Sequence, residues 1–166
     1  MRAEAIVFTS NTGYTAAYAE LLKEKTGLPA YSLSEAKKIL PKQTKIIYLG
    51  WLMAGKIEGY SKAKRRYAVA AVCGVGLGET GSQLDTVKNA NRLEADMPLF
   101  TLQGGMDLSR LHGIKKFMIQ MLTKGLSAKS GRTADEEAML ELIQKGGDYV
   151  SEENLAAVWM WYQKQH

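Results

Sequence analysis

Cysteine and histidine are scarce in this sequence. The chain of 166 residues contains one cysteine, Cys73, and two histidines, His112 and His166. A single cysteine excludes an intramolecular disulfide and is typical of a reducing compartment, so we expect a cytoplasmic protein. Because the two histidines are far apart and no cysteine cluster accompanies them, no metal site is predicted.

Long apolar runs are missing, and acidic residues are outnumbered. No stretch approaches the ~18 consecutive apolar residues that a membrane-spanning helix requires. The chain has 17 Asp and Glu against 22 Lys and Arg, which gives a net charge of +5. A basic balance can favour an anionic partner, but it is also ordinary for a protein surface. The basic run at 62–66 lacks the aromatic platform of single-strand binders, so we do not expect nucleic-acid binding.

Short apolar runs alternate with helical patterns over the first hundred residues. Five such runs predict buried strands at 5–9, 29–33, 46–49, 69–73 and 99–102. A helical pattern at 14–25 follows the first strand and ends before Gly27. A short helix with Ser34 as its expected N-cap follows the second strand, and a third helical pattern lies at 62–66. This alternation is typical of a parallel sheet with both faces covered, so we predict an α/β fold. An open doubly wound sheet fits the length better than a (β/α)₈ barrel, which takes ~250 residues.

The alternation breaks after the fifth strand, and residues 105–150 are predicted to form a helical insertion. The insertion contains one helical pattern at 108–128 and a second at 133–145, which opens with a capping box. In the first pattern, one apolar face is expected from Leu111, Ile114, Met118, Met121 and Leu122. A final amphipathic helix is predicted at 152–164. We expect residues 1–166 to form a single domain, because the insertion is too short for a core of its own.

The turn after the first strand is the strongest candidate for a binding site. The segment Ser10-Asn11-Thr12-Gly13-Tyr14-Thr15 supplies hydroxyl groups and a glycine that permits a tight turn. The helix that follows directs its unpaired N–H groups and its positive dipole end at the same point, which suits a phosphate group. The segment lacks the spacing of a P-loop and the three glycines of a dinucleotide fingerprint. The simpler alternative is a turn and helix start without a ligand.

These residues carry a resemblance to the flavodoxin-like family. The segment 10–15 is similar to the [ST]-x-T-G-x-T loop with which flavodoxins bind the phosphate of FMN, and the order of strands and helices resembles that family over essentially the whole chain. The resemblance implies a five-stranded sheet of order 2-1-3-4-5 and FMN as the cofactor. The long insertion after the fifth strand resembles a subgroup that includes the menaquinone-dependent protoporphyrinogen oxidases.

The resemblance also implies that the flavin ring is bordered by two further loops, one after the third strand and one after the fourth. The cofactor-binding residues expected there are Gly50, Trp51, Leu52, Met53, Ala54, Gly55, Gly74, Val75, Gly76 and Gly78. Trp51 can stack on the ring, with about 1 kcal/mol beyond area burial, or can be an ordinary core tryptophan. The glycines either let the backbone approach a planar ring or serve as turn residues. All three loops follow strands, and ligands of open α/β sheets bind at that edge.

Basic charge is concentrated in the insertion. Residues 109–132 contain no acid and six basic residues: Arg110, Lys115, Lys116, Lys124, Lys129 and Arg132. A basic amphipathic helix can contact an anionic membrane surface or an acidic partner. The alternative is a helix packed on its own domain with solvated lysines.

Together, these features predict an FMN-binding redox protein that transfers electrons to a protein partner or to a small acceptor such as a quinone. Two alternatives stay open: an FMN enzyme similar to protoporphyrinogen oxidase, and a binding or scaffold domain that has lost FMN. The flavin would carry the redox chemistry, and no catalytic residue is predicted. Cys73 ends the fourth strand near the expected ring and is interpreted as a buried, inert thiol.

Overall fold

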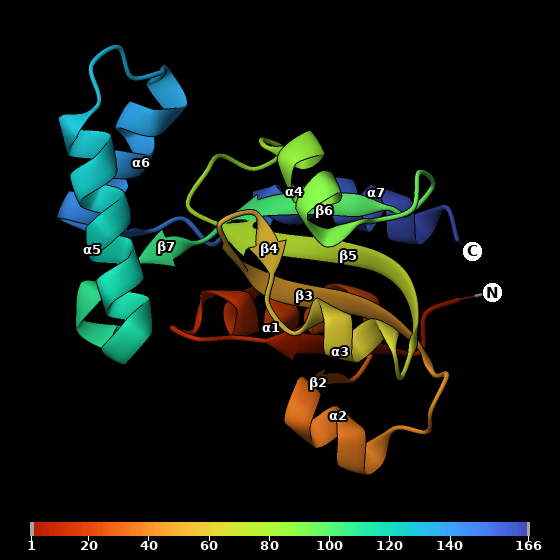
Figure 1. The fold of residues 1–166 in the computed structure, drawn as a ribbon. Coiled ribbons are helices and arrows are strands. Elements are labelled where there is room, and N and C mark those ends of the chain that lie inside the picture. Colours follow the sequence, from red (N-terminus) through yellow and green to blue (C-terminus); the bar gives the residue numbers. More distant parts are fainter. Residues whose placement is uncertain (1, 166) are drawn as a thin grey trace.

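A parallel sheet forms the centre of the molecule in the computed structural model, which describes residues 2–165 apart from the side chain of Lys115 (Figure 1). Its parallel strands are β1 (Ala5–Thr9), β2 (Ala30–Ser32), β3 (Lys45–Met53), β5 (Ala68–Gly76) and β6 (Leu99–Gln103). They lie in the order β2-β1-β3-β5-β6, which is 2-1-3-4-5 when only the parallel strands are numbered. The predicted flavodoxin-like arrangement of the sheet is therefore confirmed.

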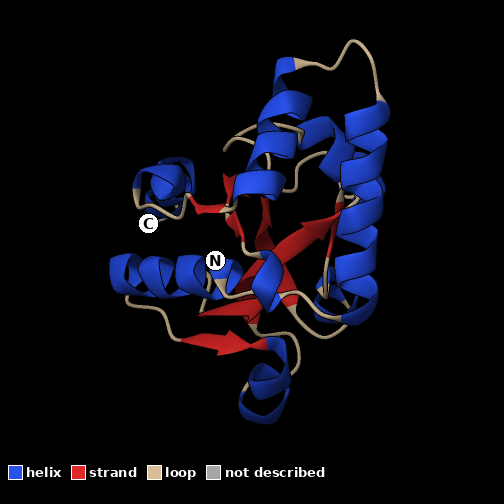
Figure 2. Ribbon diagram, turned by 90° about the vertical axis from the view of Figure 1, so that its left-hand side faces the viewer, coloured by secondary structure: helices blue, strands red, loops and turns tan. Residues whose placement is uncertain are grey.

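Helices cover both faces of this sheet (Figure 2). Side chains alternate along each strand, so Ile6 of β1 faces one layer while Ala5 and Val7 face the other. The layer on the Ile6 side contains α1 (Tyr14–Thr26) and α7 (Ala156–Gln163), and the opposite layer contains α2 (Leu33–Ile39), α3 (Tyr60–Lys64) and α4 (Leu84–Asn91). The central residues of the long strands are mostly apolar because both faces of the sheet are covered.

A helical hairpin extends beyond the carboxyl ends of the strands (Figure 1). It begins with β7 (Gly105–Met106) and a short 3-10 helix, η1 (Leu108–Arg110), and continues as α5 (Gly113–Ala128), α6 (Ala134–Lys145) and β8 (Gly147–Asp148). The two short strands pair with each other in antiparallel fashion. The amide of Tyr149 donates to the carbonyl of Gly104 at 2.9 Å, so both ends of the hairpin meet at one point.

The two helices of the hairpin pack against each other through a small apolar cluster that includes Leu111, Ile119, Leu142 and Ile143. The predicted capping box of α6 is present, because the side chains of Thr133 and Glu136 each accept a hydrogen bond from the other's amide. In the described part of the chain, every helix is too short or too polar to cross a bilayer.

The apolar residues that were grouped together in this helix are mostly exposed, so they do not form its packed side. Leu111, before the helix, is buried, but Ile114, Met118, Met121 and Leu122 are all more than 40% exposed. The side of α5 that packs contains Ile119 and Leu126, each 8% exposed. The helix has apolar residues on two sides, and the spacing of residues alone does not say which side meets α6.

Two strand ends also differ from the prediction. Residues 50–53 were expected to form a loop, but β3 continues through Met53 and pairs in antiparallel fashion with β4 (Lys56–Ile57). Likewise, β5 includes 74–76. The glycines at these positions were expected either to let the backbone approach a ring or to form turns, whereas in the strands neighbouring atoms occupy the space that a Cβ atom would need.

The N-cap of α2 is Ser32, not the predicted Ser34. The Ser32 hydroxyl accepts a hydrogen bond from the amide of Glu35 at 3.3 Å, and the Glu35 carboxylate accepts one from the amide of Ser32 at 2.9 Å. This reciprocal pair needs a carboxylate three residues after the cap. Ser32 meets that condition, whereas the third residue after Ser34 is Lys37.

A buried phenol connects α1 to the segments that follow β6 and precede α7. Tyr18 is fully buried, and its hydroxyl donates to the backbone carbonyl of Gln103. The same oxygen accepts a hydrogen bond from the side-chain amide of Asn154 at 2.8 Å. Burial raises the pKa of Tyr18, so the phenol stays protonated and keeps its donor. This network fixes the first helix relative to the carboxyl edge of the sheet.

Replacing Tyr18 with Phe should lower the free energy of unfolding by about 1–3 kcal/mol, because the part-buried carbonyl of Gln103 loses a donor and the Asn154 amide loses one of its two acceptors. Tyr60→Phe is the matched control: Tyr60 is also buried, and its hydroxyl has no hydrogen-bond partner among the described residues. This control should stay within about 0.5 kcal/mol of the wild type in urea denaturation. Equal losses in both variants would contradict the assigned role of Tyr18.

Candidate functional site

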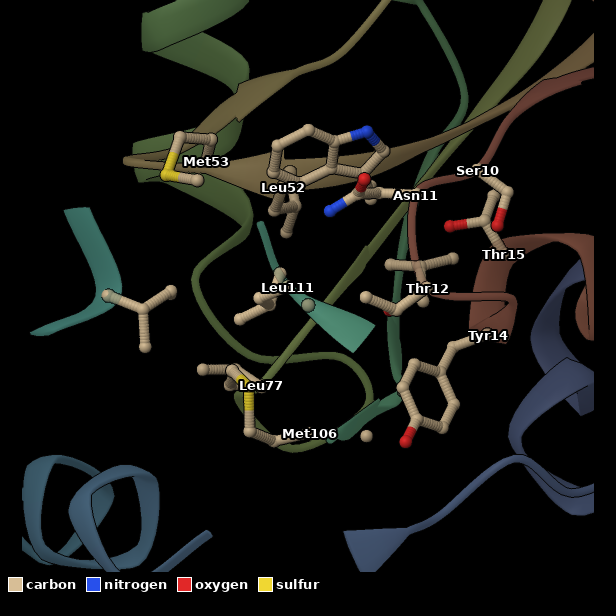
Figure 3. Close-up of a pocket in the computed structure, with 16 residues that line it drawn as sticks. Ser10, Asn11, Thr12, Tyr14, Thr15, Leu52, Met53, Leu77, Met106 and Leu111 are labelled. Atoms are coloured by element: carbon tan, nitrogen blue, oxygen red, sulfur yellow. The ribbon is translucent and has the colours of Figure 1, made fainter. Parts of the chain in front are cut away.

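A pocket opens at the carboxyl edge of the sheet, between the first loop, β3, β5 and the hairpin (Figure 3). Its volume is about 560 Å³ when the open mouth is included. Ten of the predicted residues line it: Ser10, Asn11, Thr12, Tyr14, Thr15, Trp51, Leu52, Met53, Val75 and Gly76. The fold therefore brings all three predicted segments to one place.

Six other predicted residues are not among those that line the pocket: Gly13, Gly50, Ala54, Gly55, Gly74 and Gly78. Ala54 and Gly55 make the β3–β4 turn with positive φ angles of 49° and 78°. Gly78 borders a different cavity, beside α6. Gly13 belongs to the first loop, and its φ of 101° favours glycine at the residue where α1 begins.

Leu52 explains two of the predicted glycines. A Cβ atom at Gly74 or at Gly76 would lie 2.9 Å from a methyl carbon of Leu52, which is closer than side chains pack. The absence of a side chain at both positions lets β5 accept Leu52 from the neighbouring β3. These glycines thus have a packing role within the sheet, which neither of the sequence interpretations included.

The first loop leaves backbone donors available at the start of α1. The Ser10 hydroxyl oxygen lies 3.2 Å from the amide nitrogen of Gly13 and 3.3 Å from that of Ala16, and it accepts from both. Among the described residues, the amides of Tyr14 and Thr15 have no acceptor, as expected for the first turn of a helix. Unpaired amides and the positive end of the helix dipole form a site that suits a phosphate or carboxylate.

Arg110 is a candidate residue that the sequence analysis counted only as part of the basic insertion. Its Nη1 atom donates to the carbonyl of Thr12 at 3.1 Å, and its Nε atom lies 3.1 Å from the Asp107 carboxylate. The hairpin thereby places a cation beside the first loop. No spacing pattern could indicate this contact, because 98 residues separate the two partners.

One end of the pocket is polar and the other end is apolar. The hydroxyl side chains of the first loop gather at one end, while Met53 and Leu77 lie at the other (Figure 3). The lining residues that the sequence analysis missed are mostly apolar: Leu77, Gly104, Gly105, Met106, Leu111 and Ile119. Four of them, Gly105, Met106, Leu111 and Ile119, come from the hairpin, and their position depends on tertiary packing. A ligand with an anionic group and a flat apolar body matches this division.

Tyr14 lies where the first loop meets the hairpin. Partial burial raises the pKa of its phenol, the nearby Arg110 lowers it, and the carboxylates of Asp107 and Asp148 raise it further. The phenol is therefore neutral at physiological pH and can donate or accept a hydrogen bond.

Cys73 is remote from this chemistry. It is fully buried within β5 and does not line the pocket. Burial raises the pKa of the thiol to about 12. The predicted buried thiol is confirmed, and since the thiolate is the reactive form, its nucleophilicity is suppressed in the folded protein. Among the described residues, no group of three His, Cys, Asp or Glu could hold a metal ion.

Folded protein should react with a thiol-specific disulfide reagent at pH 8 at least about 100-fold more slowly than protein unfolded in urea, because Cys73 is both inaccessible and protonated. The reaction is followed by absorbance, and Cys73→Ser gives the blank. The folded pKa lies above the ordinary value of 9.0, so this thiol supports folding fully below pH 9. That contribution is lost as the pH rises from 9 toward 12. Rapid labelling of the folded protein would contradict the assignment.

Comparison with protein-family models, curated proteins and solved structures finds no match to this chain. Evidence for a function therefore comes from the fold and from the geometry of the pocket. The sheet order supports a flavodoxin-like fold, and the pocket lies at the edge where such sheets bind ligands.

Proposed function

We propose that the pocket binds FMN and that the protein transfers electrons to a protein partner or to a small acceptor such as a quinone. The observation that carries the proposal is the junction of two unlike surfaces in one pocket: unpaired amides at the start of α1, and an apolar slot beside them. FMN has the matching pair of groups, a phosphate and a flat ring. A single cysteine is typical of proteins in a reducing compartment, which supports a cytoplasmic location as part of the proposal.

The phosphate end would use backbone donors more than side-chain charge. The amides of Tyr14 and Thr15 open α1, and Thr15 is a buried residue that lines the pocket. Arg110 adds a positive charge at the rim, although its pairing with Asp107 offsets part of that charge. Because the Arg110 side chain is 58% exposed, solvent screens its effect, so we assign it a secondary role.

The ring end would be bordered by Trp51 and Met53 from β3 and by Leu111 and Ile119 from the hairpin. Bound FMN would supply the one- and two-electron chemistry, while these residues orient the ring and limit access of water. Backbone groups at Gly76 and Gly104 also border the slot and can tune the flavin by hydrogen bonding. With the flavin supplying the redox chemistry and the chain supplying orientation, no side chain has to act as a general acid or base.

A second candidate is an FMN enzyme of the protoporphyrinogen-oxidase kind. It is favoured by one observation: Met106, Leu111 and Ile119 of the hairpin form one wall of the pocket. In such an enzyme, these side chains would contact a flat organic substrate stacked on the ring instead of bordering the ring directly. Turnover of a porphyrinogen with a menaquinone acceptor would separate this enzyme from an electron carrier, which would pass electrons on without oxidising the porphyrinogen.

Replacing Thr12 with Asp should weaken FMN binding at least about ten-fold, because a carboxylate at the loop would repel the phosphate. Binding is measured by the quenching of flavin fluorescence on titration. Gln43→Asp is the matched control, since it adds the same charge in an exposed turn at the opposite edge of the sheet, before β3. It should bind as the wild type does. A wild-type protein that fails to bind FMN at micromolar concentration would overturn the proposal and favour a scaffold that has lost the cofactor.

Replacing Arg110 with Gln should weaken FMN binding about two- to five-fold and leave riboflavin binding unchanged, because riboflavin has the ring without the phosphate. The loss should fade as salt is added, since the exposed charge is screened. Arg65→Gln is the control for net charge, because Arg65 is an exposed residue just before β5, at the amino edge. An equal effect on FMN and riboflavin would show that Arg110 only shapes the hairpin.

A further inference from the structure

The outer side of α5 is an apolar surface that nothing in the described chain covers. Five large side chains form it, and we call them the α5 stripe: Ile114, Phe117, Met118, Met121 and Leu122. They are 78%, 61%, 41%, 53% and 41% exposed, respectively. Soluble proteins seldom leave such a contiguous group open, and where they do it marks a contact with another molecule.

The spacing of these residues makes the stripe continuous. Positions 117 and 118 come three and four residues after 114, and positions 121 and 122 come three and four residues after 118, so all five lie along one side of the helix. A different side of α5 is already packed, because Ile119 and Leu126 are buried. Figure 2 shows α5 at the outer edge of the molecule. The stripe therefore faces away from the protein's own core.

The charged residues of α5 itself have one sign. The sequence of α5 contains three lysines and no Asp or Glu. Lys124 borders a groove together with Phe117 and Met121, and that groove has no acidic residue in its lining. The acids Asp135 and Glu141 of α6 line a different cavity, shared with residues 77–79. A partner of complementary chemistry is therefore apolar and anionic.

We propose that the α5 stripe docks on an anionic lipid surface, with its apolar side chains at the boundary between headgroups and acyl chains. Amphipathic helices with lysine-bearing polar faces bind in this way, and the lysine stems extend toward the lipid phosphates. A second copy of the chain fits less well, because two α5 helices would bring lysines together. One short helix also offers less than the ~800 Å² per partner of a stable interface.

The docked arrangement has a consequence that rests on the proposed function. Ile119, on the inner side of α5, lines the FMN pocket, so a lipid surface on the outer side would lie one helix away from the flavin. A lipid-soluble acceptor such as a quinone could then reach the pocket without crossing bulk water. Docking itself needs no flavin and can be measured on the apoprotein.

The test is flotation of the apoprotein with vesicles of phosphatidylcholine containing 30% phosphatidylglycerol, against vesicles of phosphatidylcholine alone. The wild type should float with the anionic vesicles at low salt and be released as salt is raised. Met121→Gln should weaken binding about five-fold. Met160→Gln is its matched control, because Met160 lies on α7 and is 56% exposed against 53% for Met121. Lys124→Gln should weaken binding to the vesicles that contain phosphatidylglycerol, and it should leave binding to vesicles of pure phosphatidylcholine unchanged.

Three results would overturn docking on lipid. One is a wild type that stays unbound with anionic vesicles at low salt; another is an equal loss in the Met121 and Met160 variants. The third is a dimer in sedimentation velocity that Met121→Gln dissociates, which would assign the stripe to a second copy. Circular dichroism confirms that each variant is folded, and FMN titration of the same samples reports separately on the proposed function.

Discussion

One hydroxyl oxygen organises the start of α1, and the pocket depends on it. The Ser10 side chain accepts from the amides of Gly13 and Ala16, and the amides of Tyr14 and Thr15 between them have no acceptor among the described residues. The same helix is anchored further along by Tyr18, whose hydroxyl contacts the end of β6 and the segment before α7. An anion site of this kind needs rigidity more than charge, because unpaired amides bind only if they converge.

The carboxyl edge of the sheet and the hairpin make the pocket jointly. The sheet supplies the polar end and one wall, and the hairpin supplies the apolar wall and the Arg110 guanidinium. Without the hairpin, the slot beside Trp51 would open to solvent. The reduction potential of a redox ring in such a slot would depend on how well the apolar wall excludes water as much as on hydrogen bonds to the ring.

Local and periodic features of the chain were predictable, whereas long-range contacts were not. The apolar runs identified all five parallel strands, since strands buried on both faces carry little polar sequence. The loop at 10–15 was found because hydroxyls, glycine and a helix start stand side by side in the sequence. Arg110 was missed because 98 residues separate it from its partner. The sequence did not show which side of α5 would be exposed, because apolar residues occupy two sides of the helix and only packing decides between them. The role of Gly74 and Gly76 needed the neighbouring strand, from which Leu52 comes.

The two ends of the hairpin are joined by one hydrogen bond, from the amide of Tyr149 to the carbonyl of Gly104. A chain that left β6 at residue 104 could continue directly at residue 149 with almost no change of path. The hairpin is therefore a separable insertion, because removing it would leave the sheet and its covering helices connected by a short link. A different segment with equally close ends could replace the hairpin between residues 104 and 149. We expect proteins with this fold to vary in length at this junction and to acquire a new specificity there.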